Sequence, residues 1–192
     1  MRQRVALPDF NQMWAGHVAA SPSPRMHDDG AERAFWRDFM ARKSYAPEPS
    51  SRQVLPHLRP LLRAMGVETA LELGPGWGSY TLDLAALCRE VACVDLPRDV
   101  LDFVLRAGAE RGFHNLRAYH AKWEEFTPER TYDLVFGYNC FYRQEDLADC
   151  FARMTRAANK LCVAGMNTGL APAWVRGLDE AGGRVSWEWK DY

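Results

Sequence analysis

Short apolar segments alternate with amphipathic ones between residues 51 and 166, and this alternation constrains the fold most strongly. The short apolar segments are typical of buried strands, whereas the longer ones repeat apolar residues at helical spacing. The predicted strands are 69–73, 90–95, 116–120, 132–137 and 160–165, and the predicted helices are 52–65, 79–88, 98–111 and 145–157. Such alternation favours a parallel sheet covered on both faces. We therefore expect a doubly wound, mostly parallel α/β fold, with ligands beyond the carboxyl ends of the strands.

Residues 1–50 are predicted to form a helical extension of this domain, which itself spans 51–192. Helix-like stretches at 8–20 and 30–43 are separated by a loop at 21–24. The second stretch is amphipathic and needs a surface to cover. We expect a cap or lid over the ligand site that includes Trp14, Phe35 and Trp36; the alternative is that these aromatic residues are plain core.

A glycine-rich turn follows the predicted strand 69–73. Its sequence is Leu71-Glu72-Leu73-Gly74-Pro75-Gly76-Trp77-Gly78. Glycine permits a sharp turn and a close approach of ligand to backbone, and the start of the next helix favours a carboxylate or phosphate. A dinucleotide fingerprint would place its third glycine at position 79, where the chain has Ser79. Taken alone, the glycines are equally compatible with a tight turn that binds nothing.

Asp95 ends the next predicted strand, 17 residues after Gly78, in Val94-Asp95-Leu96-Pro97. A carboxylate at the end of a strand can accept hydrogen bonds from both hydroxyls of a ribose. The alternative is that Asp95 only caps the helix beginning near Pro97. Because the glycine turn and Asp95 occur one βαβ unit apart, we predict a nucleoside site.

Glu72, the G-x-G-x-G pattern and Asp95 together resemble the first motifs of class I S-adenosylmethionine-dependent methyltransferases. The resemblance covers about residues 50–166 and is to members that act on small molecules. It implies a Rossmann-like methyltransferase fold, S-adenosyl-L-methionine as cofactor, and methyl transfer to a small-molecule acceptor. The glycine turn would hold the methionine end of the cofactor, and Asp95 its ribose. The cofactor contacts predicted in this way are Glu72, Gly74, Pro75, Gly76, Gly78, Asp95, Leu96, Lys122 and Trp123.

Residues 121–124 resemble the family segment that brackets the adenine ring. Family members often have an aspartate just before the residue that packs on adenine, whereas this chain has Lys122. Trp123 would stack on the ring; packing in the core is the alternative.

Residues 132–136 resemble the fourth-strand motif of the family, so the residues that follow would line the site near the transferred methyl group. Gly-Tyr-Asn-Cys replaces the Asn/Asp-Pro-Pro-aromatic motif of many enzymes that methylate amino groups of nucleic acids, which argues against adenine or cytosine acceptors. Tyr138, Asn139 and Tyr142 are the residues predicted to position the acceptor. His120 is a candidate base, or a structural residue.

The family sheet usually ends with an antiparallel hairpin of a sixth and a seventh strand. In this sequence a short helix is predicted near 172–181, and only 185–189 could form a sixth strand. We therefore expect a shortened C-terminal edge. A strand from a partner in a homodimer could complete it, or the sequence could be a fragment of a longer protein.

Bulk properties narrow the alternatives. The sequence has no run of about 18 apolar residues, no secretory signal and no zinc-like cysteine spacing, so we expect a cytoplasmic protein without a membrane span or metal. Residues 1–66 carry 10 Lys/Arg and 6 Asp/Glu, a basic excess too weak to argue for nucleic acid as a partner. The rival functions are a catalytically inactive binding protein with this fold, an RNA methyltransferase and, more remotely, a nicotinamide-dependent oxidoreductase.

Overall fold

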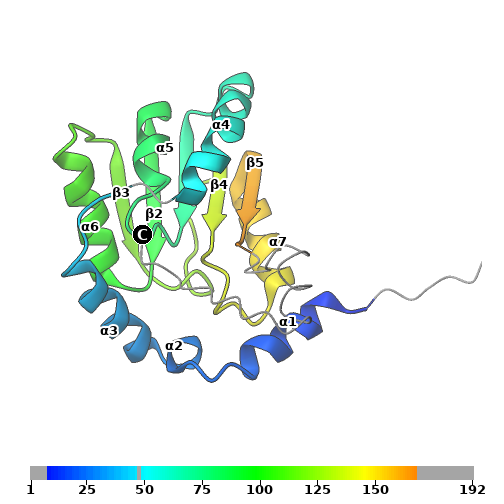
Figure 1. Cartoon of the computed structure of the whole chain (residues 1–192). Coiled ribbons are helices and arrows are strands. Elements are labelled where there is room, and N and C mark those ends of the chain that lie inside the picture. Colours follow the sequence, from blue (N-terminus) through cyan, green and yellow to red (C-terminus); the bar gives the residue numbers. More distant parts are fainter. Residues whose placement is uncertain (1–7, 47–48, 168–192) are drawn as a thin grey trace, which may run out of the picture.

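The computed structural model describes residues 8–46 and 49–167, and within them a five-stranded parallel sheet is the central element (Figure 1). The strand order is β3-β2-β1-β4-β5. The strands are β1 (Thr69–Leu73), β2 (Glu90–Asp95), β3 (Leu116–His120), β4 (Tyr132–Tyr138) and β5 (Ala158–Gly165). The chain moves outwards from β1 in one direction and then returns to the other side of β1 at β4. The predicted doubly wound α/β fold is therefore confirmed.

Helices cover both faces of the sheet. The helices of the described residues are α1 (Phe10–Ala19), α2 (Pro24–His27), α3 (Asp29–Met40), α4 (Pro49–Ala64), α5 (Thr81–Leu87), α6 (Arg98–Ala109) and α7 (Leu147–Ala157), of which α4 to α7 cover the faces. Leucines and valines of α4, α5 and α6 pack on one face, around Val91 and Phe136. On the other face Met154 and Cys150 of α7 pack against Leu71 and Val135. Burial of such side chains, about 1.5–3 kcal/mol each, is the main stabilisation of the fold.

The predicted helices and strands of residues 51–166 are present with small shifts at their ends. Helix α5 begins at Thr81 rather than 79, because the glycine turn continues through Gly78, whose φ is +85°. Helix α7 begins at Leu147 rather than 145, because the side chain of Asp146 accepts the Asp149 N–H and caps the helix.

The N-terminal segment contains three helices where the sequence predicted two. The additional helix is α2, which follows Ser23 and has Pro24 at its first position, where proline is well tolerated. Helices α1, α2 and α3 lie along the edge of the sheet at which the strands end (Figure 1). Helix α1 is held there by Trp14, whose Nε1 donates to Gln144 O at 2.6 Å. The segment therefore borders the edge where a ligand is expected.

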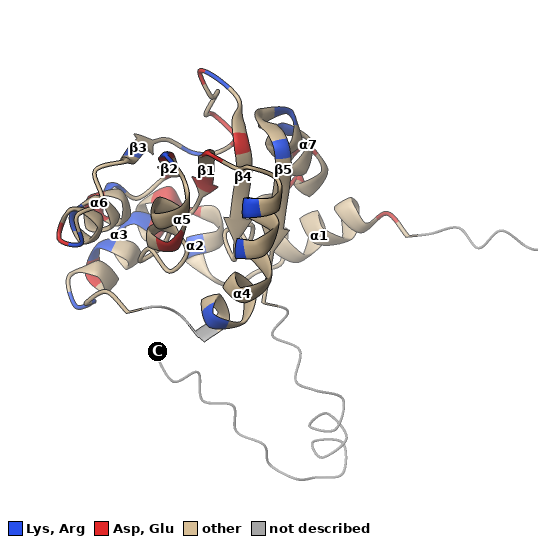
Figure 2. Cartoon of the chain, turned by 90° about the horizontal axis from the view of Figure 1, so that it is seen from above, with Lys and Arg blue, Asp and Glu red and all other residues tan. Residues whose placement is uncertain are grey.

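The helix predicted near 172–181 and the strand predicted at 185–189 lie outside the described residues. Among the residues that are described, no helix is long and apolar enough to cross a membrane. Acidic and basic positions are interspersed along the ribbon (Figure 2).

Candidate functional site

A cavity of about 590 Å³ opens at the carboxyl edge of the sheet. It lies beside β1, at the point where the strand order reverses, with β2 on one side of β1 and β4 on the other. This is the usual ligand position in such folds. Helices α2 and α3 contribute to its wall together with the segments after β1, β2, β3 and β4. The predicted residues that line it are Glu72, Gly74, Pro75, Gly76, Asp95, Leu96, Lys122, Trp123, Tyr138, Asn139 and Tyr142. Gly78 and His120 are not part of this lining.

The glycine turn needs its glycines for its backbone conformation. Gly74, Gly76 and Gly78 have φ values of +57°, +54° and +85°, a region that residues with a Cβ rarely adopt. A Cβ on Gly74 would approach Cys140 closer than 3.0 Å, whereas one on Gly76 would meet Trp36 at an ordinary 3.7 Å. The Gly78 N–H donates to Pro75 O at 2.9 Å and closes the turn. The turn thus presents bare backbone to the cavity, as the methionine end of the predicted cofactor requires.

Glu72 lies at the cavity below this turn, with only 2% of its surface exposed. Burial raises the pKa of Glu72 to about 7, although a hydrogen bond with Thr81 lowers it. Its carboxyl group is therefore partly protonated near neutral pH and can donate or accept a hydrogen bond.

Asp95 ends β2 and faces the same cavity. Its Oδ1 accepts the Leu96 N–H at 2.8 Å, and the N-cap of α6 is Pro97, without a side-chain capping bond. The geometry thus does not favour the capping alternative. Burial, with further contributions from Glu32 and Glu72, raises the pKa of Asp95 to about 8. Hydrogen bonds from ribose hydroxyls would stabilise the charged form, so this carboxyl group fits the predicted nucleoside.

The segment after β3 contributes Lys122 and Trp123. The Nζ of Lys122 lies 2.7 Å from Asp29 Oδ2, so its partner comes from the first residue of α3. Trp123 is only 7% exposed and packs in the core with Val94 and Phe141, although part of it borders the cavity. The structure thus shows the core packing of Trp123, and its stacking on an adenine ring stays a prediction.

The segment after β4 contributes Tyr138, Asn139 and Tyr142, whose polar groups already have partners in the chain. Tyr138 OH donates to Asn167 Oδ1 at 2.6 Å, and Asn139 Oδ1 accepts the Asn167 N–H at 2.6 Å. Asn139 has a φ of +53°, a conformation that asparagine tolerates better than most residues. Tyr142 OH donates to Glu32, and burial raises the Tyr142 pKa, so this phenol stays neutral.

Two carboxylates of α3, which the sequence analysis did not identify, connect the N-terminal helices to the cavity. Glu32 is only 3% exposed and accepts from Arg25 Nε at 2.7 Å, from Trp36 Nε1 at 2.7 Å and from Tyr142. Asp29 binds Lys122 on one side and Arg143 Nη2, at 2.6 Å, on the other. No local sequence pattern predicts the role of these two residues. The amphipathic pattern of α3 indicates that the helix packs on the domain, but not which polar groups its carboxylates contact.

The other sequence candidates lie around this site rather than in it. Trp36 lines the cavity, whereas Trp14 and Phe35 do not. Phe35 stacks under the Arg25 guanidinium, 3.4 Å from the ring centroid. His120 is exposed, and its Nε2 donates to Leu96 O at 2.8 Å. His120 therefore supports the chain around Leu96.

Comparisons with known proteins agree with the fold. Residues 70–160 match a family model described as a methyltransferase domain. No curated protein sequence matches the chain significantly. A Methanococcus maripaludis protein assigned as an S-adenosyl-L-methionine-dependent methyltransferase is 15% identical with a TM-score of 0.55; the match covers 85% of this chain and 73% of that one.

Two further solved structures share the fold. DhpI, solved with SAH, is 18% identical over 68% of this chain, with a TM-score of 0.54. The N-methyltransferase NodS from Bradyrhizobium japonicum is 20% identical over 58% of this chain, with a TM-score of 0.50. The chain spans 64% of the length of each of these two structures. Residues 70–160 of this chain therefore match a methyltransferase domain, and the chain has the fold of these solved methyltransferase structures.

Proposed function

We propose that this chain binds S-adenosyl-L-methionine and transfers its methyl group to a small-molecule acceptor. The observation that carries the proposal is the meeting of the glycine turn and Asp95 in one cavity of about 590 Å³. A turn of left-handed glycines and a strand-end carboxylate, one βαβ unit apart, suit the two ends of a nucleoside that carries an amino acid.

Each part of the site has a separate binding role in this proposal. The backbone of Gly74 and Gly76 holds the amino-acid end, Asp95 accepts hydrogen bonds from the ribose hydroxyls, and Leu96 and Trp123 contact the base. When bound, the cofactor supplies an electrophilic methyl group on a sulfonium ion. The chain then has to hold the acceptor in line with that group and exclude water.

The acceptor side is assigned to Tyr138, Asn139 and Tyr142. Because their polar groups bind Asn167 and Glu32, these residues act mainly by shaping the wall of the site. Tyr142 stays neutral because burial raises its pKa, so it does not serve as a general base. An acceptor whose nucleophile needs no deprotonation, such as a neutral amine, suits this wall best.

Residues 1–50 are assigned the role of a lid. Asp29, Glu32 and Trp36 of α3 line the cavity, and each is bonded or packed against the methyltransferase domain. A segment in this position limits the access of water and favours a small acceptor over a polymer. Deletion of residues 1–45 should therefore weaken cofactor binding and reduce turnover, and the lid role is refuted if both stay unchanged.

Calorimetric titration with S-adenosylmethionine and S-adenosylhomocysteine tests the proposal. We expect micromolar binding that Asp95→Ala weakens tenfold or more, about 1.4 kcal/mol. Asp102→Ala is a matched control, since Asp102 lies on α6 in an exposed ion pair with Arg98. A folded chain that binds neither compound would refute the function. Binding without methyl transfer to any amine, thiol or hydroxyl acceptor in a screen would favour the inactive binding protein.

A further inference from the structure

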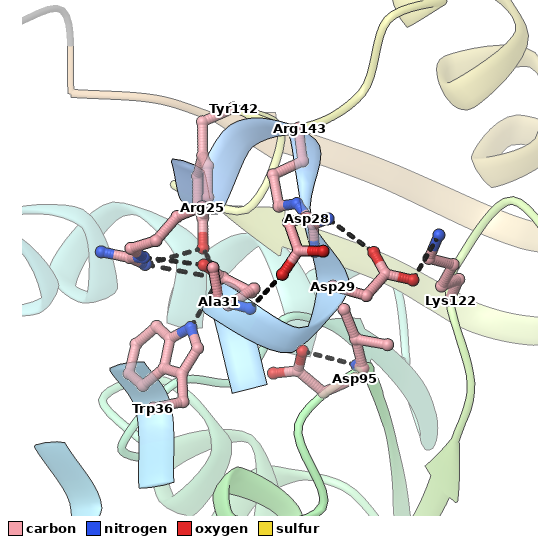
Figure 3. Close-up of polar contacts among 11 residues, drawn as sticks. Arg25, Asp28, Asp29, Ala31, Trp36, Asp95, Lys122, Tyr142 and Arg143 are labelled. Carbon is pink, nitrogen blue, oxygen red and sulfur yellow. Dashed lines mark hydrogen bonds and ion pairs between the residues drawn. The ribbon is translucent and has the colours of Figure 1, made fainter. Parts of the chain in front are cut away.

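Asp29 forms a bridge between two cations at the wall of the cavity (Figure 3). Its Oδ2 lies 2.7 Å from Lys122 Nζ, and its Oδ1 lies 2.6 Å from Arg143 Nη2. Both cations, like Asp29, line the cavity. The segments that meet here come after β3, after β4 and from the start of α3, and Asp29 is more than 90 residues away in the sequence from both Lys122 and Arg143.

The position of Asp29 is fixed from both sides. The side chain of Asp28 accepts the Ala31 N–H at 2.5 Å and caps α3, so Asp29 is held as the first residue of the helix. One turn later the buried carboxylate of Glu32 binds Arg25 and Tyr142. Asp29 is therefore held more firmly than an ordinary surface ion pair, which fluctuates in water.

Asp29 is also held in its charged form. Burial alone would raise the pKa of Asp29, but hydrogen bonds with Lys122 and Arg143 outweigh it and keep the pKa below its ordinary value. The bridge thus combines a charged carboxylate acceptor with the side-chain amino group of Lys122 as a donor.

The register of the sheet places this bridge next to the proposed ribose contact. Asp95 pairs with His120 across β2 and β3, and the Ala121 N–H donates to Asp95 O at 3.1 Å. A base on a ribose held by Asp95, pointing away from the glycine turn, would therefore extend towards residues 121–123. Lys122 and its partner Asp29 lie on that side.

We propose that Asp29 of the N-terminal segment, together with Lys122, recognises the hydrogen-bonding edge of adenine. The inference rests on the proposed function and assigns this contact to a residue outside the matched domain. The amino group at N6 of adenine would donate to Asp29, and N1 would accept from Lys122. Hypoxanthine has an acceptor at position 6 and a donor at N1, so the same pair would disfavour it.

Binding of S-adenosylhomocysteine and S-inosylhomocysteine, measured by calorimetry, tests this inference. The wild-type chain should bind the adenosyl compound at least tenfold more tightly. Asp29→Ala should reduce this preference to about threefold or less, and Lys122→Met should reduce it too. Asp102→Ala is the matched control and should keep the full preference, because it removes an aspartate from a 2.8 Å ion pair away from the cavity.

The possible results separate the two proposals. If the wild-type chain binds S-adenosylhomocysteine but Asp29→Ala lowers both affinities equally, Asp29 only holds α3 in place and the inference is overturned. A folded Asp29→Asn variant keeps an oxygen acceptor, so it can retain the preference for the adenosyl compound. This result agrees with the inference only if Asp29→Ala loses the preference. Absence of S-adenosylhomocysteine binding by the wild-type chain refutes the proposed function instead.

Discussion

Replacing Gly74 by alanine should separate two reasons for a glycine at this position. The residue has a φ of +57°, so a Cβ adds backbone strain of about 1–2 kcal/mol. The same Cβ would also come closer than 3.0 Å to Cys140, which forces the glycine turn and the segment after β4 apart. Overpacking of this kind costs about 1–3 kcal/mol. We therefore expect Gly74→Ala to lower the free energy of unfolding by about 2–5 kcal/mol.

Two other glycines provide controls for this prediction. Gly112 has a φ of +79° with nothing within 4 Å of an added Cβ, and Gly76 has a φ of +54° with only Trp36 nearby, at 3.7 Å. Gly112→Ala and Gly76→Ala should therefore show the strain without the clash. In a chain of this size each kcal/mol lost from the free energy of unfolding lowers the melting temperature by about 2–4 °C.

Urea unfolding of the three variants, followed by circular dichroism, gives the comparison. Combining Gly74→Ala with Cys140→Gly removes the opposing Cβ, so the double variant should be more stable than the two single effects predict when added. If Gly74→Ala is no more destabilising than Gly112→Ala, or if the pair shows no coupling, the proposed contact with Cys140 is wrong.

Three further predictions follow from the site. Because the Asp95 pKa is about 8 and ribose hydroxyls stabilise its ionised form, S-adenosylhomocysteine affinity should rise from pH 6 to 8 and level off above; calorimetry of Asp95→Asn should show a weaker dependence. Glu32→Ala leaves the partly exposed Arg25 without its ion pair and should destabilise by about 3 kcal/mol, with faster hydrogen exchange in α3 as the decisive readout. Asp146→Ala removes the cap of α7 and should lower the free energy of unfolding, measured by thermal unfolding, by about 1 kcal/mol; a decrease below 0.3 kcal/mol would contradict the capping role.

Much of the sheet could be predicted from the sequence, because its signals are local. The five strands are short apolar runs, and β1 to β4 are each followed within a few residues by a turn or a helix start. Gly74, Gly76 and Asp95 could be placed at one edge for the same reason, since carboxyl ends of parallel strands meet there. The short helix α2 was missed, because Pro24 marks a loop as often as it marks the first position of a helix.

The sequence by itself therefore determined the layered fold and the two ends of the proposed nucleoside site. Only the tertiary structure decided which groups complete that site. Asp29 and Glu32 meet Lys122, Tyr142 and Arg143 across more than 90 residues of chain. The apolar face of α3 indicates that this helix packs on the domain. Helical periodicity does not specify the position and rotation at which its charged residues meet their partners. That choice depends on the shape and charge of the docked surfaces, which exist only in the folded chain.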